Sequence, residues 1–372
     1  MAMVDPTLKN EERIVFQLRS LYHTYGYSQY KMSKFEEYDL YAQNKDFLKS
    51  DGIITFTDTN GRLMALKPDV TLSIVRNSRP APRCVQKVYY HENVYRVSQQ
   101  SHSFREITHV GVECIGDVDP YCVAETLLLA SKSLSLITEN WRLCLSHLDI
   151  LSCLIDRLGV PEVERGRVLS FVEGKNLHEL NALCRGLGCP ENAVRDINAL
   201  LSLSGDPDEA IAFLSGLNLP DIILPPFIQA VEVMREAGVL QNVSVDFSIV
   251  GDMAYYNGFV FKGFVSGVPA GVLSGGQYDR LLSRMGKSSR GIGFAVYLDL
   301  LERLGERAET FDADMLILYD DGADVKALSR TVSQFTALGV RAVAQKTVPD
   351  GQRFKQIAHF SGSGVEILDS NA

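Results

Sequence analysis

The first third of the chain carries a pattern of hydrophobic and polar positions that predicts one helix followed by a sheet. Over 8–27 the apolar residues fall on one stripe with a period of 3.6 residues, and Gly26 ends it. The runs that follow are rich in Val, Ile, Tyr and Thr and have only turns between them, which indicates antiparallel pairing. These predicted strands are Ile53–Asp58, Leu63–Leu66, Val85–His91, Val94–Val97 and Val110–Ile115.

Beyond the predicted sheet, the periodicity becomes helical and then changes twice more. A helix is predicted over Pro120–Thr138, and several short helices are predicted between 161 and 240, where prolines precede the apolar stretches. Strand patterns return at Val243–Val250, Phe259–Phe264 and Gly271–Leu273, and helices are predicted at Tyr278–Arg284 and Gly293–Leu304.

The last part of the chain follows a polar linker at Glu306–Asp312 and has a βαβ-like pattern. A buried strand at 315–319, a helix at Val325–Ala337 and a strand at Arg341–Ala344 are predicted. We therefore expect three parts: a core made of 1–160 and 241–305, a helical insertion at 161–240, and a small α/β domain at 312–372.

Composition limits the class of protein. The 372 residues are 46% hydrophobic and 22% charged, which is typical of a globular protein, and no apolar run approaches the roughly 20 residues that cross a membrane. The polar N-terminus has no signal-peptide pattern, so a cytoplasmic location is expected. The seven cysteines include no CxxC pair, which argues against disulfides and a zinc site. No cofactor or metal is expected.

The charge balance argues against a nucleic-acid partner. Net charge is −9, and residues 311–372 hold eight acidic and six basic side chains, a net of −2. A protein that binds tRNA neutralises many of its phosphates with Lys and Arg side chains. We therefore expect no tRNA partner.

Two segments place polar side chains in patterns suited to a small cationic ligand. Asp69 and Thr71 follow Pro68 and, on an extended segment, would point to one face, although a simple loop cap is an alternative. Arg96 lies near the end of a predicted strand. His109 and Glu113 alternate onto one face of the next strand, where chance polar residues on a solvated sheet face are the alternative.

Two further segments carry aromatic residues and glycines. Tyr255 and Tyr256 precede a turn at Asn257-Gly258, where paired aromatics either wall a ligand pocket or belong to the core. Gly275-Gly276 lies ahead of a helix and permits close backbone approach to a ligand, although a glycine pair alone is a weak signal.

In this order, these segments resemble the motifs of histidyl-tRNA synthetase over roughly 8–304. LKPDVT (66–71) is similar to the family's LRPE-x-T, and VYR…FREITHVGVECIG (94–116) is similar to its motif 2 hairpin. MAYYNG and GGQYDRL are similar to the two histidine-specific motifs RGLDYYTG and GGRYDGL, and GIGFAVYLDLLERL is similar to motif 3. The resemblance implies an α+β fold: a class II synthetase-like antiparallel sheet of six or seven strands flanked by helices, with the helical insertion and the small C-terminal domain attached.

The departures from these motifs concern the nucleotide side of the site. Gly251 and Leu300 stand where the family has arginines, Ser103 replaces one arginine of the hairpin tip, Ser98 replaces a glutamate and Ser33 a proline. Fixed guanidinium groups stabilise the charge that develops on the α-phosphate, and losing one such contact typically costs about 3–4 kcal/mol of barrier. The chain is therefore expected not to be an enzyme.

The amino-acid side of the motifs survives as residue types, except that His109 replaces a glutamine. The resemblance implies a histidine-binding site made of Asp69, Thr71, Arg96, His109, Glu113, Tyr255 and Tyr256. Its acids would take the α-ammonium and imidazole, the tyrosines would enclose the ring, and Arg96 would hold the carboxylate.

A chain with these properties resembles the non-catalytic branch of the family, the regulatory subunits of ATP phosphoribosyltransferase. That resemblance implies a homodimer within a hetero-octamer with a short-form catalytic subunit, and feedback by L-histidine on the first step of histidine biosynthesis. Two alternatives stay open. One is an active but divergent histidyl-tRNA synthetase, in which Arg280, Arg290 or Lys262 replaces the missing charges. The other is a synthetase-like binding module linked to RNA.

Overall fold

The computed structural model describes residues 10–44, 52–97, 103–203, 205–251, 253, 255–301, 311–362 and 364–370. Ser98, most of the hairpin tip at 99–103, the start of the predicted helix at 8–27 and most of the linker at 306–312 lie outside the described residues. The chain divides into two compact units, Met1–Leu304 and Gly305–Ala372, and each is described by itself.

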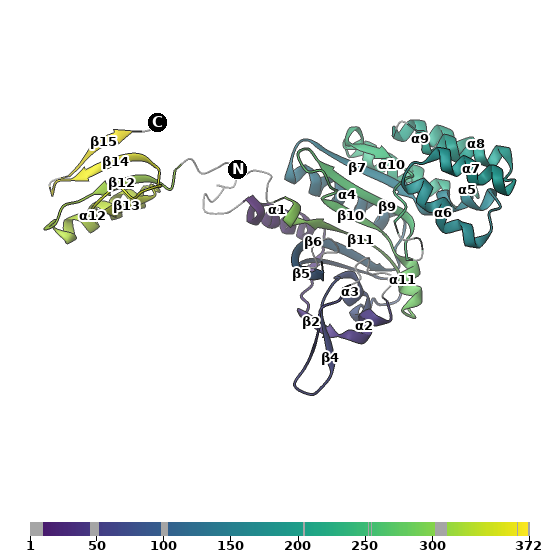
Figure 1. Ribbon diagram of the computed structural model, residues 1–372, viewed down its shortest axis with the longest axis horizontal. Helices are drawn as coiled ribbons and strands as arrows, with labels where there is room; N and C mark the ends of the chain where they lie inside the picture. The colour runs from purple at the N-terminus through teal and green to yellow at the C-terminus, as the bar shows by residue number, and fades with distance from the viewer. Residues whose placement is uncertain are drawn as a thin grey trace. The chain divides into compact units, whose positions relative to one another are not determined.

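A mixed eight-stranded sheet forms the centre of the first unit (Figure 1). Its six inner strands pair antiparallel, whereas the short edge strands β1 and β8 pair parallel to their neighbours. The predicted α+β class is confirmed, and these edge strands raise the strand number above the expected six or seven. In spatial order the strands are β1 (Ser28–Gln29), β5 (Val85–Val97), β6 (Phe104–Gly116), β11 (Arg290–Tyr297), β10 (Leu273–Gln277), β9 (Asn257–Val265), β7 (Trp141–His147) and β8 (Val243–Val245).

Helices cover both faces of this sheet. On one face, α4 (Pro120–Ile137) packs against β7, β9 and β11 and contacts α1 (Asn10–Thr24). Asp119 begins α4 by accepting a hydrogen bond from the backbone N–H of Cys122 at 2.8 Å, and Pro120 occupies the first turn. On the other face lie α3 (Thr71–Asn77), against β6, and α11 (Asp279–Arg284), against β11.

The strand β11 corrects one prediction. Gly293–Leu304 was expected to be a helix, but the described part of this segment continues β11 and then forms a 3-10 turn at Leu298–Leu300. The reason is alternation: Ile292, Phe294 and Val296 are buried on the face shared with α4, while small residues lie between them. A Cβ on Gly293 would lie 1.9 Å from Oε2 of Glu113, so only glycine fits there.

Several other strand predictions are corrected in their bounds, among them Val110–Ile115, which is part of the longer strand β6. The runs Val85–His91 and Val94–Val97 form the single strand β5, which pairs with β6 from Val85↔Gly116 to Val97↔Phe104. The run Val243–Val250 ends as a strand at Val245. The run predicted at Gly271–Leu273 is β10, which contains Gly275 and Gly276. Cβ atoms on these glycines would meet neighbouring strands first, so the glycines serve sheet packing.

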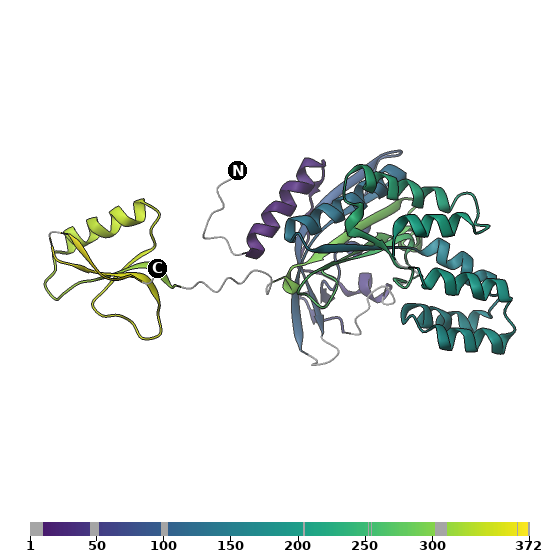
Figure 2. The same cartoon turned by 90° about the horizontal axis from the view of Figure 1, so that it is seen from above.

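A smaller sheet and a group of helices complete the first unit. The small sheet has the order β2 (Phe35–Glu37), β4 (Leu63–Leu66), β3 (Thr55–Thr57), with α2 (Tyr38–Ala42) beside it. Most of the helices that follow β7 gather beyond one end of the large sheet (Figure 2), whereas α10 (Leu224–Glu236) packs along α4. The segment between β7 and β8 contains α5 (Leu148–Arg157), α6 (Glu162–Glu173), α7 (Leu177–Leu187), α8 (Glu191–Leu201), α9 (Pro207–Ser215), α10 and the 3-10 turn η2 (Leu240–Asn242).

The second unit is a four-stranded sheet with one helix. Its order is β13 (Ala342–Gln345), β12 (Ala313–Leu318), β14 (Phe354–Phe360), β15 (Val365–Ser370), with α12 (Val325–Ala337) between β12 and β13 in the chain. The sequence predicted β12, α12 and β13 but missed β14 and β15. Across the described parts of both units, no helix is long and apolar enough to span a membrane.

Candidate functional site

A buried carboxylate, Glu113, is the centre of the polar cluster on the sheet face that carries α3 and α11. It lies on β6, is only 2% exposed, and faces the gap left by Gly293 on the neighbouring strand. The Tyr278 hydroxyl donates to its Oε2 at 2.6 Å, and the Thr71 hydroxyl donates to its Oε1 at 2.7 Å. Burial raises the pKa of Glu113 to about 8, although these two hydrogen bonds act in the opposite direction.

The segment that carries Asp69 and Thr71 has a different backbone conformation from the extended one that the sequence predicted. They do not share a face of an extended segment, because Thr71 is the first residue of α3. The Asp69 carboxylate accepts from the backbone N–H of Leu72 at 2.9 Å, which is the loop-cap geometry that was the alternative interpretation. Burial raises the pKa of Asp69, so this acid, like Glu113, holds its proton more tightly than a carboxyl group in water, and a cation placed beside it would favour its ionised form.

Arg96 and His109 form the second part of the cluster. The Arg96 Nε donates to the Pro68 carbonyl at 3.0 Å, and its charge acts to lower the pKa values of both Asp69 and His109. His109 is 5% exposed and packs edge-on against Tyr297, its partner on β11, with ring centroids 4.9 Å apart. Burial, the larger cause, and Arg96 together lower the pKa of His109 to about 3, so its ring is neutral.

One ring nitrogen of the neutral His109 makes no hydrogen bond to the described residues. Nε2 is buried and has no hydrogen-bond partner among the residues that the structure describes. A buried ring nitrogen without a partner is unfavourable unless a ligand supplies one. His109 thus lies on the same sheet face as Glu113 with one ring nitrogen unpaired, and its role in ligand binding stays a prediction.

The two predicted tyrosines lie at the apolar side of the cluster. Tyr255 is buried in the same hydrophobic cluster as Tyr90 and Tyr278, and the Arg284 guanidinium lies over its ring, 4.8 Å from the centroid. Tyr256 is partly buried and contacts the edge of that cluster. The structure thus brings Tyr255 to the site as a wall and Tyr256 to its border.

Sequence reasoning missed three tyrosines of the site: Tyr90, Tyr278 and Tyr297. Tyr90 pairs with Gly111 across β5 and β6, and a Cβ on Gly111 would lie 2.5 Å from the Tyr90 hydroxyl. Tyr278 lay inside a motif already singled out for its glycines. The Tyr90 and Tyr297 positions required the strand register, which the sequence alone did not supply.

The structure also describes Gly251, Leu300 and Ser103, the positions at which the motif resemblance implies arginines in the synthetases. Gly251 has a φ of +59°, a backbone conformation that residues with a side chain rarely adopt. Leu300 is partly buried against the main hydrophobic core. Ser103 is exposed at the start of the strand segment that leads into β6. None of these side chains carries a charge.

Comparison with known proteins bears on both the fold and the family. The chain is 25% identical to a protein of Oceanobacillus iheyensis described as an ATP phosphoribosyltransferase regulatory subunit, over 371 residues that cover 96% of this chain and 88% of the relative. Among solved structures, the "ATP phosphoribosyltransferase regulatory subunit/histidyl-tRNA synthetase from Bacillus halodurans C" has a TM-score of 0.75 at 23% identity and covers 96% of this chain and 98% of its own.

A second structural neighbour is the "ATP phosphoribosyl transferase (HisG:HisZ) complex from Thermotoga maritima", with a TM-score of 0.62 at 19% identity. It covers 77% of this chain and 97% of the matched chain. The sequence model of the histidyl-tRNA synthetase family matches residues 2–301. Since that match spans most of the chain and includes every strand and helix of the polar cluster, the chain belongs to the histidyl-tRNA synthetase family.

Proposed function

We propose that this chain is a non-catalytic regulatory subunit of ATP phosphoribosyltransferase, supporting the first step of L-histidine biosynthesis and mediating its feedback by histidine in the cytoplasm. The proposal is supported by the O. iheyensis relative, which matches 96% of this chain and is described as an ATP phosphoribosyltransferase regulatory subunit, and by the T. maritima neighbour, which is a chain of an ATP phosphoribosyl transferase complex. The observation that carries the proposal is a preserved acid cluster around Glu113 in a chain that has uncharged residues at Gly251 and Leu300.

The lack of synthetase activity follows from the charges that the motifs require. Gly251 and Leu300 offer no guanidinium to the α-phosphate or the triphosphate of ATP. Arg290, a candidate replacement, is three residues from Gly293 on β11, and its side chain pairs with Asp279 at 3.1 Å. It points to the sheet face opposite Glu113 and therefore does not restore the missing charge.

The ligand of the cluster is L-histidine in this proposal. Its α-ammonium and its imidazole face the two acids Asp69 and Glu113, its carboxylate pairs with Arg96, and His109 Nε2 completes the hydrogen bonds. Two buried acids next to one guanidinium match a ligand with two basic groups and one acid. Tyr255 and Tyr256 enclose the imidazole ring.

The assembly in this proposal is a homodimer of the chain within a hetero-octamer with a short-form catalytic subunit. It uses no cofactor and binds no tRNA. The core at 1–160 and 241–305 holds the histidine site, and the insertion at 161–240 and the C-terminal domain at 312–372 are separate parts of the regulatory subunit. Feedback then requires that histidine prefer one of two states of the complex, typically by 1–3 kcal/mol.

Calorimetric titration with L-histidine tests the ligand assignment. Glu113→Gln keeps the shape of the side chain and removes its charge, and we expect binding to weaken by about 10- to 100-fold, the usual loss for a charge-assisted hydrogen bond. Glu106→Gln is the matched control, because Glu106 is an exposed acid on the same strand. Equal binding by the two variants, or no binding by the wild type, would reject the assignment.

Pyrophosphate exchange into ATP in the presence of histidine separates this proposal from a divergent synthetase. A regulatory subunit gives no exchange above background. Exchange that depends on histidine would mean that other groups have replaced the missing arginines, and the non-catalytic role would be abandoned.

A further inference from the structure

A cavity lies on the opposite side of the large sheet from Glu113. Its volume is about 950 Å³, within the range of small-molecule pockets, and it lies between the ends of β9, β10 and β11, the start of α4, and helices α5 and α10. Arg290 and Gln277 line it; Gln277 pairs with Ile292, next to Gly293, so both side chains point away from the Glu113 face.

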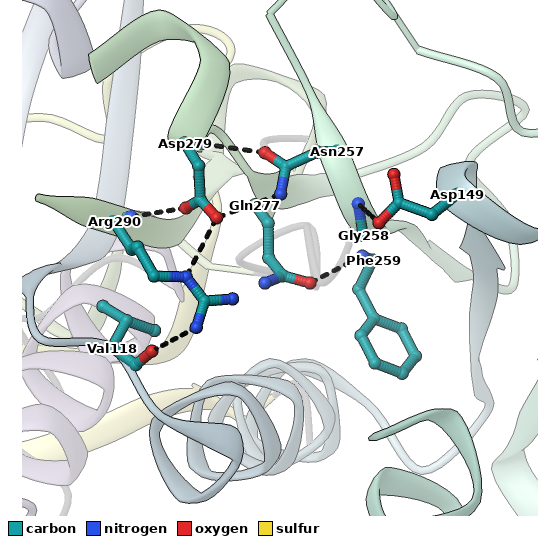
Figure 3. A network of polar contacts seen from close by, with 9 residues as sticks. Val118, Asp149, Asn257, Gly258, Phe259, Gln277, Asp279 and Arg290 are labelled. Carbon is teal, nitrogen blue, oxygen red and sulfur yellow. Dashed lines mark hydrogen bonds and ion pairs between the residues drawn. The ribbon is translucent and has the colours of Figure 1, made fainter. Parts of the chain in front are cut away.

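Gln277 presents an unused donor to this cavity. The side chain is 5% exposed, and its Oε1 accepts from the backbone N–H of Phe259 at 2.8 Å (Figure 3). Because a backbone N–H faces an oxygen, this contact fixes the orientation of the amide and leaves Nε2 on the other side. Among the described residues, Nε2 has no hydrogen-bond acceptor.

Arg290 presents a second donor beside it. Its Nε donates to Asp279 at 3.1 Å and its Nη1 donates to the Val118 carbonyl at 2.9 Å, so the guanidinium is held at two points. Asp279 is itself fixed by Asn257 and by the Gly291 backbone N–H. The remaining Nη2 has no acceptor within the described part of the chain, and Figure 3 shows it directed toward the amide of Gln277.

The other side of the cavity carries a carboxylate. Asp149, at the start of α5, accepts from the Gly258 backbone N–H at 3.1 Å through one oxygen, and its other oxygen is 3.8 Å from the Arg280 guanidinium. In Figure 3 it lies across Gln277 from Arg290. His147, also in the lining, adds no positive charge, because burial lowers its pKa to about 4.

We infer that this cavity is a second ligand site, which takes a zwitterionic α-amino acid with an apolar side chain. The carboxylate accepts from Gln277 Nε2 and Arg290 Nη2, and the ammonium pairs with Asp149. Gln277 Nε2 and Arg290 Nη2 face each other, and neither has a protein acceptor among the described residues, so one carboxylate placed between them can accept from both. The acid opposite them disfavours a purely anionic ligand.

The rest of the lining suits an apolar side chain. Val123, Phe259, Ile223 and Pro226 contribute to the wall between the two polar ends. This site goes beyond the proposed histidine site, since it lies on the other sheet face and shares none of the residues assigned to histidine.

The test is a calorimetric titration of the full chain with L-leucine and with two analogues that each lack one end. 4-Methylpentanoate lacks the ammonium, and 3-methylbutylamine lacks the carboxylate. L-Leucine should bind, and each analogue should bind at least about 10-fold more weakly, because each leaves one charged partner unpaired. No heat from L-leucine at about 10 mM, well above the range of a millimolar site, overturns the inference.

Two variants locate the binding. Asp149→Asn keeps the acceptor for Gly258 and removes the charge, so leucine should weaken at least about 10-fold while 4-methylpentanoate is unchanged. Gln277→Glu keeps the acceptor for Phe259 and replaces the donor, so both carboxylate ligands should weaken. Asp320→Asn, an exposed acid of the second unit, is the control and should bind leucine as the wild type does.

Glu113→Gln separates this inference from the proposed function. It should leave leucine binding unchanged even though it weakens histidine binding. If leucine binding is lost in Glu113→Gln and kept in Asp149→Asn, leucine occupies the other face and the second site does not exist. Thermal melts of each variant confirm folding, and Gln277→Glu serves as the independent measurement if Asp149→Asn does not fold.

Discussion

At the scale of single residues, the chemistry of the cluster depends on an acid that the fold keeps away from water. Burial raises the pKa of Glu113 and the nearby Asp69 adds to that rise, whereas the hydrogen bonds from two hydroxyl groups oppose it. A carboxyl group in this setting holds its proton well above its ordinary pKa. Without a ligand, the Glu113 carboxyl is therefore protonated at neutral pH, and a cationic ligand that binds against it displaces this proton.

The first prediction concerns stability and pH. The pKa of Glu113 is raised to about 8 in the folded chain, so its contribution to stability is complete below its ordinary pKa of 4.5 and is lost as pH rises through 8. Urea unfolding at a series of pH values should show a fall on the order of 3–5 kcal/mol between pH 5 and pH 9. Glu113→Gln should remove this fall, and an unchanged pH profile in that variant would contradict the assignment.

A second prediction concerns protons released on binding. If histidine binds with its α-ammonium against Glu113, the protonated acid ionises, and about one proton should leave the protein at pH 7. Calorimetry in buffers of different ionisation enthalpy measures that number directly. Glu113→Gln should release none, whereas Glu106→Gln should behave as the wild type does.

Tyr278 is the third test at this scale. Tyr278→Phe removes the donor to Glu113 Oε2 without changing the ring, and leaves a buried acceptor with one partner fewer. We expect a loss of about 1–2 kcal/mol in unfolding free energy, measured near pH 9, where Glu113 is ionised. A loss that is larger at pH 5 than at pH 9 would show that the protonated acid is the form that Tyr278 stabilises.

At the scale of elements, the site depends on how closely β6 and β11 approach. A Cβ on Gly293 would lie 1.9 Å from Glu113 Oε2 and 2.4 Å from the Val112 carbonyl. Gly293→Ala should therefore destabilise the chain by about 2 kcal/mol or more and weaken histidine binding. Gly186→Ala, in helix α7 with open space around it, should be neutral or stabilise by up to about 1 kcal/mol in thermal unfolding.

The elements also show what the sequence can and cannot predict. Helices α1, α4 and α12 were predicted because each has an apolar stripe, and α4 also begins at an Asp-Pro cap and α1 ends near Gly26. The strand β11 was taken for a helix because a short apolar run fits both periods, and its partners on β6 and β10 decide the outcome. No element was predicted from the sequence over the segment that forms β7 and α5.

At the scale of the whole molecule, the site is assembled from segments far apart in the chain. The Arg96, His109 and Glu113 positions followed from one predicted hairpin. Tyr278 and Thr71 join them only because α3 and α11 lie on the same face of the sheet as Glu113. Thr71 is the first residue of α3, and Tyr278 connects β10 to α11. Such long-range placement depends on strand order and register, which local patterns do not determine. The family resemblance supplied that order; propensities alone did not.

The proposed function of the whole molecule is to regulate a catalytic subunit. The most direct measurement is the ATP phosphoribosyltransferase activity of a short-form catalytic subunit, alone and with this chain, with and without L-histidine. The account predicts that the chain raises the activity, that histidine lowers it again, and that Glu113→Gln keeps the first effect and loses the second. A catalytic subunit whose activity is the same with and without the chain would contradict it.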